Sequence, residues 1–236
     1  MTLLRISRKL HKWLMLLLGL QFLIWSVSGA YMVILDIDYI HGDTLVNQSP
    51  TPINASQVKV TFQQVLRQYP EAKNISLSML QKQAVYLFDH HGETQRLSAT
   101  TGKLLAPITQ AQAISIAKST YSGQGEIKEV QLITEDTEQA PNELSRRVLP
   151  AWQVHFDDFA SPTLYVSKNS GQVVTKRHSF WRIFDWMFKF HIMDYQDSEV
   201  DNNLLFFTAL IGVFSALAGL VLVYFSVLRR SNGSAS

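Results

Sequence analysis

Cysteine is missing from all 236 residues of the chain. Its absence excludes disulfide bonds, thiolate metal sites, cysteine catalysis and the attachment of c-type haem. Any folded domain must therefore be held together by its hydrophobic core, and a segment of about 130 to 140 residues is long enough to form one.

Charged side chains are missing from two long apolar runs, one near each end of the chain. The first run extends over 23 positions from Trp13 to Leu35, and the second over 25 positions from Leu204 to Leu228. A helix needs about 20 residues to cross the hydrocarbon core of a bilayer. We therefore expect transmembrane helices at 13–35 and 204–228.

The first run also has features of a cleaved signal peptide. Its start is basic, and the small residues Ser28, Gly29 and Ala30 resemble a cleavage site. The apolar character continues past these residues to Leu35, which favours an uncleaved anchor. Even a cleaved chain would keep the second run as an anchor.

Basic residues predict the orientation of the chain, because Lys and Arg near helix ends stay preferentially in the cytoplasm. We expect 1–12 and 229–236 to be cytoplasmic and the central segment to be exported. That segment has 15 basic and 19 acidic residues, so the pI near 8.8 gives no reason to expect nucleic-acid binding. The basic flanks are Arg5, Arg8, Lys9, Lys12, Arg229 and Arg230.

The exported segment contains two similar halves, residues 36–107 and 108–178. Each half begins with a helical pattern, which follows the N-capping Thr109 in the second half. Alternating strands come next, and each half ends on a turn with glycine, Gly102 or Gly171. This pattern predicts a membrane-anchored α+β protein in which one helix packs on a small antiparallel sheet, twice. The polar stretch 134–147 is expected to be an exposed loop between two strands.

The segment "LPAWQVHFDD...PTLYVSKNSGQVV" resembles a PepSY module. The segments "RKLHKWLMLLLGLQFLIWSVSG" and "FHIMDY...NNLLFFTALIGVFSALAGLVLVY" are similar to the PepSY-associated transmembrane family of bacterial inner-membrane proteins. This resemblance implies two membrane spans and a tandem periplasmic domain with a degenerate first copy. Some relatives in that family are linked to iron and siderophore uptake or are haem-bearing ferric-siderophore reductases, and soluble PepSY domains are associated with peptidase inhibition.

Three histidines lie near the ends of the expected spans: His11, His41 and His191. An imidazole from each of two helices is the arrangement that ligates a b-type haem. We expect His41 to pair with His191 at the exported face and His11 to pair with its copy from a second chain, which requires a homodimer or a larger membrane complex. The alternative is that these histidines bind headgroups or backbone at the interface, next to an interfacial aromatic helix at 179–195.

Two adjacent histidines, His90 and His91, lie in the string "DHHGE" and are candidate metal ligands. The alternative is a polar hairpin turn in which Gly92 supplies the bend. The chain has no Gly-x-Ser-x-Gly and no His-Glu-x-x-His, so neither a serine hydrolase nor a zinc hydrolase is indicated.

Small residues four apart in the second run, Gly212 with Ala216 and Ser215 with Gly219, predict close packing against another helix. The first run is the expected partner, and Gln21 is the one strongly polar side chain in either run. Buried between helices, Gln21 is expected to form a hydrogen bond across them.

These features favour a non-enzymatic binding or accessory role in the lipid bilayer, with a periplasmic peptide or protein as partner. We expect an extended peptide to add to the strands 152–158 and 163–166, where the recognition residues would be Trp152, Val154, Phe156 and Tyr165. Two other functions stay open: a haem-binding oxidoreductase component that reduces ferric chelates, and a purely structural subunit of a larger complex.

Overall fold

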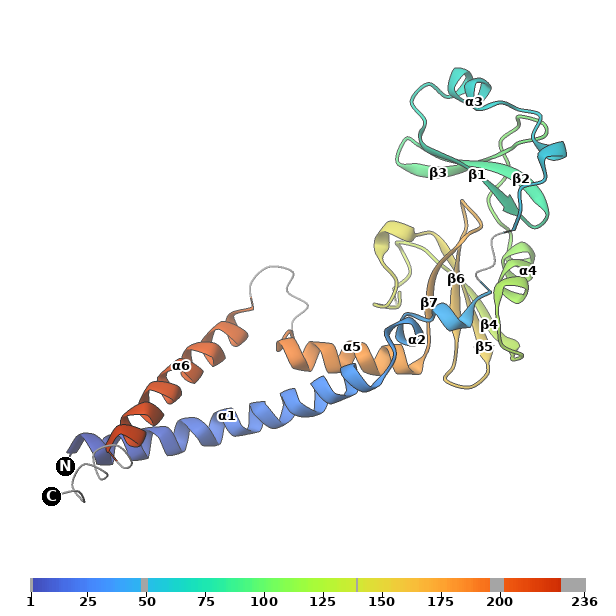
Figure 1. Ribbon diagram of the computed structural model, residues 1–236. Helices are drawn as coiled ribbons and strands as arrows, with labels where there is room; N and C mark the ends of the chain where they lie inside the picture. The colour runs from blue at the N-terminus through green and yellow to red at the C-terminus, as the bar shows by residue number, and fades with distance from the viewer. Residues whose placement is uncertain (1, 48–50, 139, 196–201, 226–236) are drawn as a thin grey trace. The chain divides into compact units, whose positions relative to one another are not determined.

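The computed structural model describes residues 2–47, 51–138, 140–195 and 202–225. The chain divides into two compact units. Unit 1 comprises 1–36 and 183–236, and unit 2 comprises 37–182. Figure 1 shows the elements of both units in chain colours.

Unit 1 is helical and holds the two apolar runs. Helix α1 (Thr2–Ile34) packs against α6 (Asn203–Val223), and α5 (Ser179–Ile192) extends into this unit from unit 2. Both α1 and α6 are long and apolar enough to cross a membrane. Helix α1 begins earlier than expected, so the basic residues before Trp13 are part of it. The predicted tail at 229–236 lies outside the described residues.

Unit 2 is α+β and contains two antiparallel sheets, as the repeated pattern predicts. The first sheet has the order β1-β2-β3 and the second the order β4-β5-β6-β7. Short helices missed by the sequence analysis are α2, η1 and η2 near the start of the unit and η3 before β5. The bounds are α2 (Ile37–His41), η1 (Asp43–Leu45), η2 (Ala55–Gln57), α3 (Phe62–Gln68), β1 (Lys73–Leu80), β2 (Gln83–His90), β3 (Glu93–Ser98), α4 (Gln110–Thr120), β4 (Glu126–Ile133), η3 (Arg146–Val148), β5 (Ala151–Asp157), β6 (Thr163–Ser167) and β7 (Val173–Arg177).

The two halves of unit 2 begin their helices in the same way. Thr61 before α3 and Thr109 before α4 each accept a hydrogen bond from the third helical residue, Gln64 or Gln112. Each glutamine side chain in turn accepts from the backbone N–H of its threonine, which completes a capping box. The expected N-cap at Thr109 is therefore confirmed.

The turns that end the two halves are also equivalent. Gly102 has φ +71° and Gly171 has φ +72°, a left-handed conformation that glycine adopts without strain. Gly171 is further constrained, since a Cβ there would lie 2.7 Å from Cδ2 of Leu80 in the first sheet. The β6–β7 turn therefore packs closely against the other half of the unit.

A buried arginine also joins the two halves. Arg96 on β3 donates from Nε to the carbonyl of Asn169, 2.9 Å away in the β6–β7 turn, and from Nη2 to the carbonyl of Ala106. Burial lowers the pKa of Arg96. Because Asn169 belongs to the second half, the bond from Nε of Arg96 connects the two sheets at this contact.

The polar stretch 134–147 connects β4 to β5, as expected, but it is only partly exposed. Leu144 is buried with Ile133, Ala151 and Tyr165 on the face of the second sheet that α4 does not cover. The expectation of an exposed loop is therefore wrong at Leu144, whose apolar side chain covers the sheet, whereas residues 145–147 are exposed.

Candidate functional sites

Most large apolar side chains of helix α1 are exposed, and the two buried residues described in it, Ser7 and Ser28, are small and polar. Its less exposed residues recur every three or four positions, which is one face of a helix. Large apolar residues such as Leu16, Leu20 and Phe22 are exposed. These less exposed residues, called the inward face below, are Ser7, His11, Leu14, Leu18, Gln21, Ile24, Trp25, Ser28, Gly29, Tyr31 and Met32.

Helix α6 has the same inverted distribution. Its two buried residues, Ser215 and Ala218, are small, while Phe206, Phe214 and Leu217 are exposed. Of the two small pairs predicted from the sequence, Ser215 and Gly219 lie on the inward face, whereas Ala216 of the other pair is exposed. Helix α6 contacts α1, as expected.

The side chain of His11, on α1, packs against α6. Its Nδ1 is 3.0 Å from the backbone carbonyl of Ser215. A carbonyl only accepts, so Nδ1 of His11 carries the proton. The ring packs against Gly219, where a Cβ would lie 3.1 Å from Cε1 of His11. Glycine at this position therefore leaves the space that the imidazole occupies.

His191, near the end of α5, is held by α1 in a similar way. Its Nδ1 is 3.0 Å from Oγ of Ser28, and Ser28 donates its single proton to the carbonyl of Ile24 at 2.7 Å. Nδ1 of His191 is therefore the donor. A Cβ on Gly29 would lie 3.2 Å from Cε1 of His191, so this ring also packs against a glycine.

Both histidines thus use Nδ1 for a hydrogen bond, so the neutral imidazole has its lone pair on Nε2, which is a common ligand atom for metals. His11 and Ser28, the partner of His191, are both on α1 and about 26 Å apart along the helix axis at 1.5 Å per residue. They belong to two separate sites.

His41 is exposed on α2 in unit 2, and its pairing with His191 stays a prediction.

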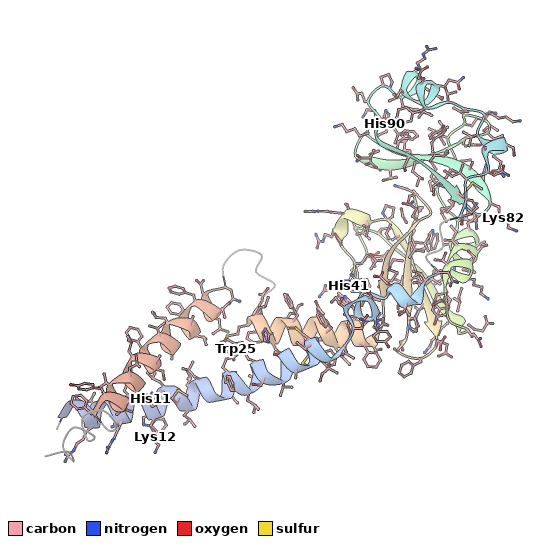
Figure 2. All side chains as sticks on the ribbon, viewed as in Figure 1. His11, Lys12, Trp25, His41, Lys82 and His90 are labelled. Carbon is pink, nitrogen blue, oxygen red and sulfur yellow. The ribbon has the colours of Figure 1, made fainter. Side chains whose placement is uncertain are left out.

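Two further polar side chains of the inward face have an unused donor. The Nε2 atom of Gln21 and the Nε1 atom of Trp25 are buried without a hydrogen-bond partner among the described residues. Nε2 of Gln21 therefore does not make the bond expected across the helices. Figure 2 shows Trp25 and His11 on the same helix.

His90 is the last residue of β2 in the first sheet (Figure 2), and His91 follows it in the β2–β3 turn. Asp89 organises this hairpin, since its carboxylate accepts from Asn74 and Thr94, each at 2.8 Å. His91 is exposed with φ +53° in the turn. The described residues contain no cluster of three or more His, Cys, Asp or Glu side chains that could hold a metal. A metal site at His90 and His91 would therefore lack a third ligand from the described part of the chain.

The residues expected to recognise a partner are not at an accessible edge. Val154, Phe156 and Tyr165 are buried, and Nε1 of Trp152 donates to the carbonyl of Ile108 at 2.9 Å. Their strands, β5 and β6, are the two inner strands of the sheet. The prediction is corrected, because these side chains lie on inner strands, and a peptide could add to this second sheet only at its edge strands β4 or β7.

A charged network that the sequence analysis missed lies on the uncovered face of the second sheet. Arg182, in the first turn of α5, forms two hydrogen bonds to Glu143, from Nε at 2.7 Å and from Nη2 at 2.9 Å. Tyr165 donates to the same carboxylate at 2.7 Å. Burial lowers the pKa of Arg182, but the hydrogen bonds and charge of Glu143 outweigh it and the pKa is raised.

A second histidine interaction fixes the start of α5. His178 is buried, and its Nε2 donates to the carbonyl of Tyr39 at 2.7 Å, while its Nδ1 accepts from the N–H of Trp181 at 3.3 Å. His178 therefore caps α5 and binds α2 at the same time. Both bonds together require a neutral imidazole. No local sequence pattern predicts this contact, because the two segments are far apart in the chain.

Models of protein families, curated proteins and solved structures were compared with the chain, and none of them matches.

Proposed function

We propose that α1 and α6 anchor this chain in a bacterial inner membrane and that unit 2 is a PepSY-like periplasmic module that binds a partner without catalysis of its own. The observation that carries the anchoring is the inverted distribution of side chains in unit 1. In water, a helix pair buries its apolar face. In lipid, apolar side chains face outwards and small residues lie between the helices. The buried residues described in α1 and α6 are all small: Ser7, Ser28, Ser215 and Ala218.

The orientation is tested with single cysteines, which the cysteine-free chain makes specific. A membrane-impermeant maleimide should label Glu135→Cys in intact spheroplasts and label Lys12→Cys only after lysis. Both side chains are exposed in the structure, so a difference in labelling cannot come from burial of one position within the protein. Labelling of both positions in intact spheroplasts would contradict the proposed topology.

The proposed recognition surface is the outer edge of β1. This edge strand has no charged side chain from Asn74 to Leu80. The edge strand β4, in contrast, has Glu126, Lys128 and Glu129, and charged residues on an edge prevent the pairing of another strand. An uncharged edge with open backbone groups is suited to an extended peptide.

The edge is tested by placing a photo-crosslinking amino acid at the exposed Ser76 on β1 and, as a matched control, at the exposed Lys128 on β4. We expect a discrete adduct in cells from position 76 and none from position 128. Adducts from both positions, or only from 128, would contradict recognition at β1.

The second candidate function is haem-based electron transfer across the membrane. The observation that favours it is the shared hydrogen-bond pattern of His11 and His191, whose Nδ1 atoms are engaged by Ser215 and Ser28. This pattern fits an axial haem ligand, since it orients the ring and leaves Nε2 for iron. Bound haem would supply one-electron transfer, with the second ligand coming from another chain.

This candidate is tested by the absorbance spectrum of the full-length protein, purified in mild detergent from iron-replete, haem-supplemented cells. A Soret band with sharp reduced bands is expected, and His11→Ala and His191→Ala should each remove about half of the haem if the two sites are independent. His91→Ala, at the exposed hairpin, is the control with full colour. A colourless protein would exclude this function.

A further inference from the structure

The turn between β5 and β6 presents an aromatic ring to the outside of unit 2. Phe159 in this turn is 79% exposed, the largest value among the large apolar side chains described in unit 2. Single exposed apolar residues are common on soluble proteins and need no special explanation. Phe159 differs from such residues in the rigidity of its turn and in its neighbours.

The turn is held rigid by Asp158. Its carboxylate accepts from the hydroxyl of Tyr121 at 2.8 Å, from the N–H of Gly125 at 2.9 Å and from the N–H of Phe159 at 2.7 Å. Ala160 and Ser161 follow with positive φ angles of 63° and 49°. A chain fixed in this way exposes the Phe159 ring in a defined position, so little conformational freedom is lost when the ring is buried by another surface.

The turn also contacts the start of α5, as Figure 1 shows at the lower end of the second sheet. The N–H of Ser179 donates to the carbonyl of Ala160 at 2.7 Å. The ring of Phe159 lies 5.9 Å from that of Phe180, and Phe180 lies 5.7 Å from Tyr39. Three aromatic rings from three separate segments therefore form a row: Phe159, Phe180 and Tyr39.

This row is tied to the membrane-spanning segments by short connections. Tyr39 is five residues beyond the end of α1 at Ile34, so the two are separated by at most about 17 Å of extended chain. Phe180 is the second residue of α5, and Ile183, one turn further along that helix, is also an exposed apolar residue. Cζ of Arg177 lies 4.0 Å from the ring centroid of Trp181, a residue type that is enriched in the headgroup region.

We propose that the β5–β6 turn is a lipid-contacting wedge, in which Phe159 inserts its ring into the headgroup region of the same bilayer, next to Phe180. The proposal rests on the anchoring of α1 and α6 proposed above and adds a third contact with the membrane. Trp and Tyr are enriched at this depth because their rings are amphipathic. Phe side chains of interfacial segments are buried at the boundary between headgroups and acyl chains. The wedge fixes unit 2 against the bilayer.

The test uses Phe159→Cys labelled with an environment-sensitive fluorophore, in full-length protein reconstituted into vesicles of phosphatidylethanolamine and phosphatidylglycerol. A 79% exposed side chain leaves no cavity when it is replaced. We expect a blue shift, quenching by lipids with a nitroxide near the headgroup, and loss of quenching by aqueous iodide. Phe62→Cys, at a residue 50% exposed at the start of α3, should be quenched by iodide only.

A third position separates this proposal from the anchoring itself. Val213→Cys, at a residue 57% exposed on α6, should be quenched by lipids with a nitroxide deep in the acyl chain. If Val213→Cys is in lipid while Phe159→Cys is quenched by iodide, the wedge is excluded and the anchor stands. If both positions are aqueous, the anchor is excluded as well. If Phe159→Cys is shielded from iodide but not quenched by lipid, another protein surface covers it and the wedge is excluded.

Discussion

Replacing Glu143 with glutamine is expected to lower the free energy of unfolding of unit 2 by about 3 kcal/mol, the lower end of the range for breaking a buried ion pair. The carboxylate is almost fully buried, whereas the Arg182 side chain is 36% exposed and solvent partly screens its charge. Loss of the negative charge leaves the guanidinium paired only with neutral groups, and the amide N–H of glutamine faces its donors. The measurement is chemical unfolding of the full-length protein in mild detergent, followed by near-ultraviolet circular dichroism.

Two further variants show whether the loss of stability comes from the buried network around Glu143. Tyr165→Phe removes the hydrogen bond to the same carboxylate and the one that Gln153 donates to the hydroxyl, and should cost about 1–2 kcal/mol. Glu126→Gln breaks the exposed ion pair with Lys118 and should leave the unfolding midpoint unchanged. If Glu143→Gln behaved like Glu126→Gln, the network would not contribute to the attachment of α5 to the sheet.

Acidification below pH 6.5 is expected to destabilise unit 2 through His178. Burial lowers the pKa of His178 from 6.5; the carbonyl of Tyr39 raises it, and the charges of Arg182 and Arg177 lower it further. Between the folded pKa and 6.5, the unfolded chain binds a proton that the folded chain does not. Stability therefore rises with pH in this interval, is complete above 6.5, and falls as the pH drops, by up to about 1.4 kcal/mol per pH unit.

The variant that tests this is His178→Asn. Its side-chain oxygen can still accept from the N–H of Trp181, since asparagine is a good N-cap, but it does not titrate. We expect lower stability at neutral pH, from the lost bond to Tyr39, and a smaller loss on acidification. Unfolding curves between pH 7 and pH 5 measure both. An unchanged acid slope would contradict the role of His178.

His155 contributes to the same acid slope and is separated from His178 by its own variant. Burial lowers the pKa of His155, and the charges of Arg182 and Lys128 lower it further, while Glu129 and Asp157 raise it. His155→Gln should therefore remove a second part of the slope. The double variant with His178→Asn is expected to show the smallest pH dependence.

Local chemistry explains why much of unit 2 could be predicted from the sequence. Thr109, Gly102 and Gly171 act on the backbone within a few residues, through a cap and two left-handed turns. The alternation of apolar and polar side chains in the strands also depends only on neighbouring residues. The repeated helix and sheet therefore follow from the sequence, and the structure confirms them.

The order of strands explains the main correction. An edge strand and an inner strand can have the same alternating sequence pattern. Only the pairing of the inner strand on both sides distinguishes them, and that pairing is a property of the folded sheet. Val154 and Phe156 were therefore expected at a recognition surface, although β5 lies between β4 and β6 and both side chains are buried. The short helix α2 was missed for a similar reason, since the carbonyl of its Tyr39 is held by the distant His178.

By itself, the sequence determined the two apolar helices, the repeat and its caps and turns, because length, charge and short-range hydrogen bonds decide these features. Only the tertiary structure decided which side chains meet across the chain: His11 with Ser215, His191 with Ser28, and Arg182 with Glu143. Each of these contacts joins segments that are far apart in sequence. Their energies depend on burial and on the geometry of both partners, which no local pattern contains.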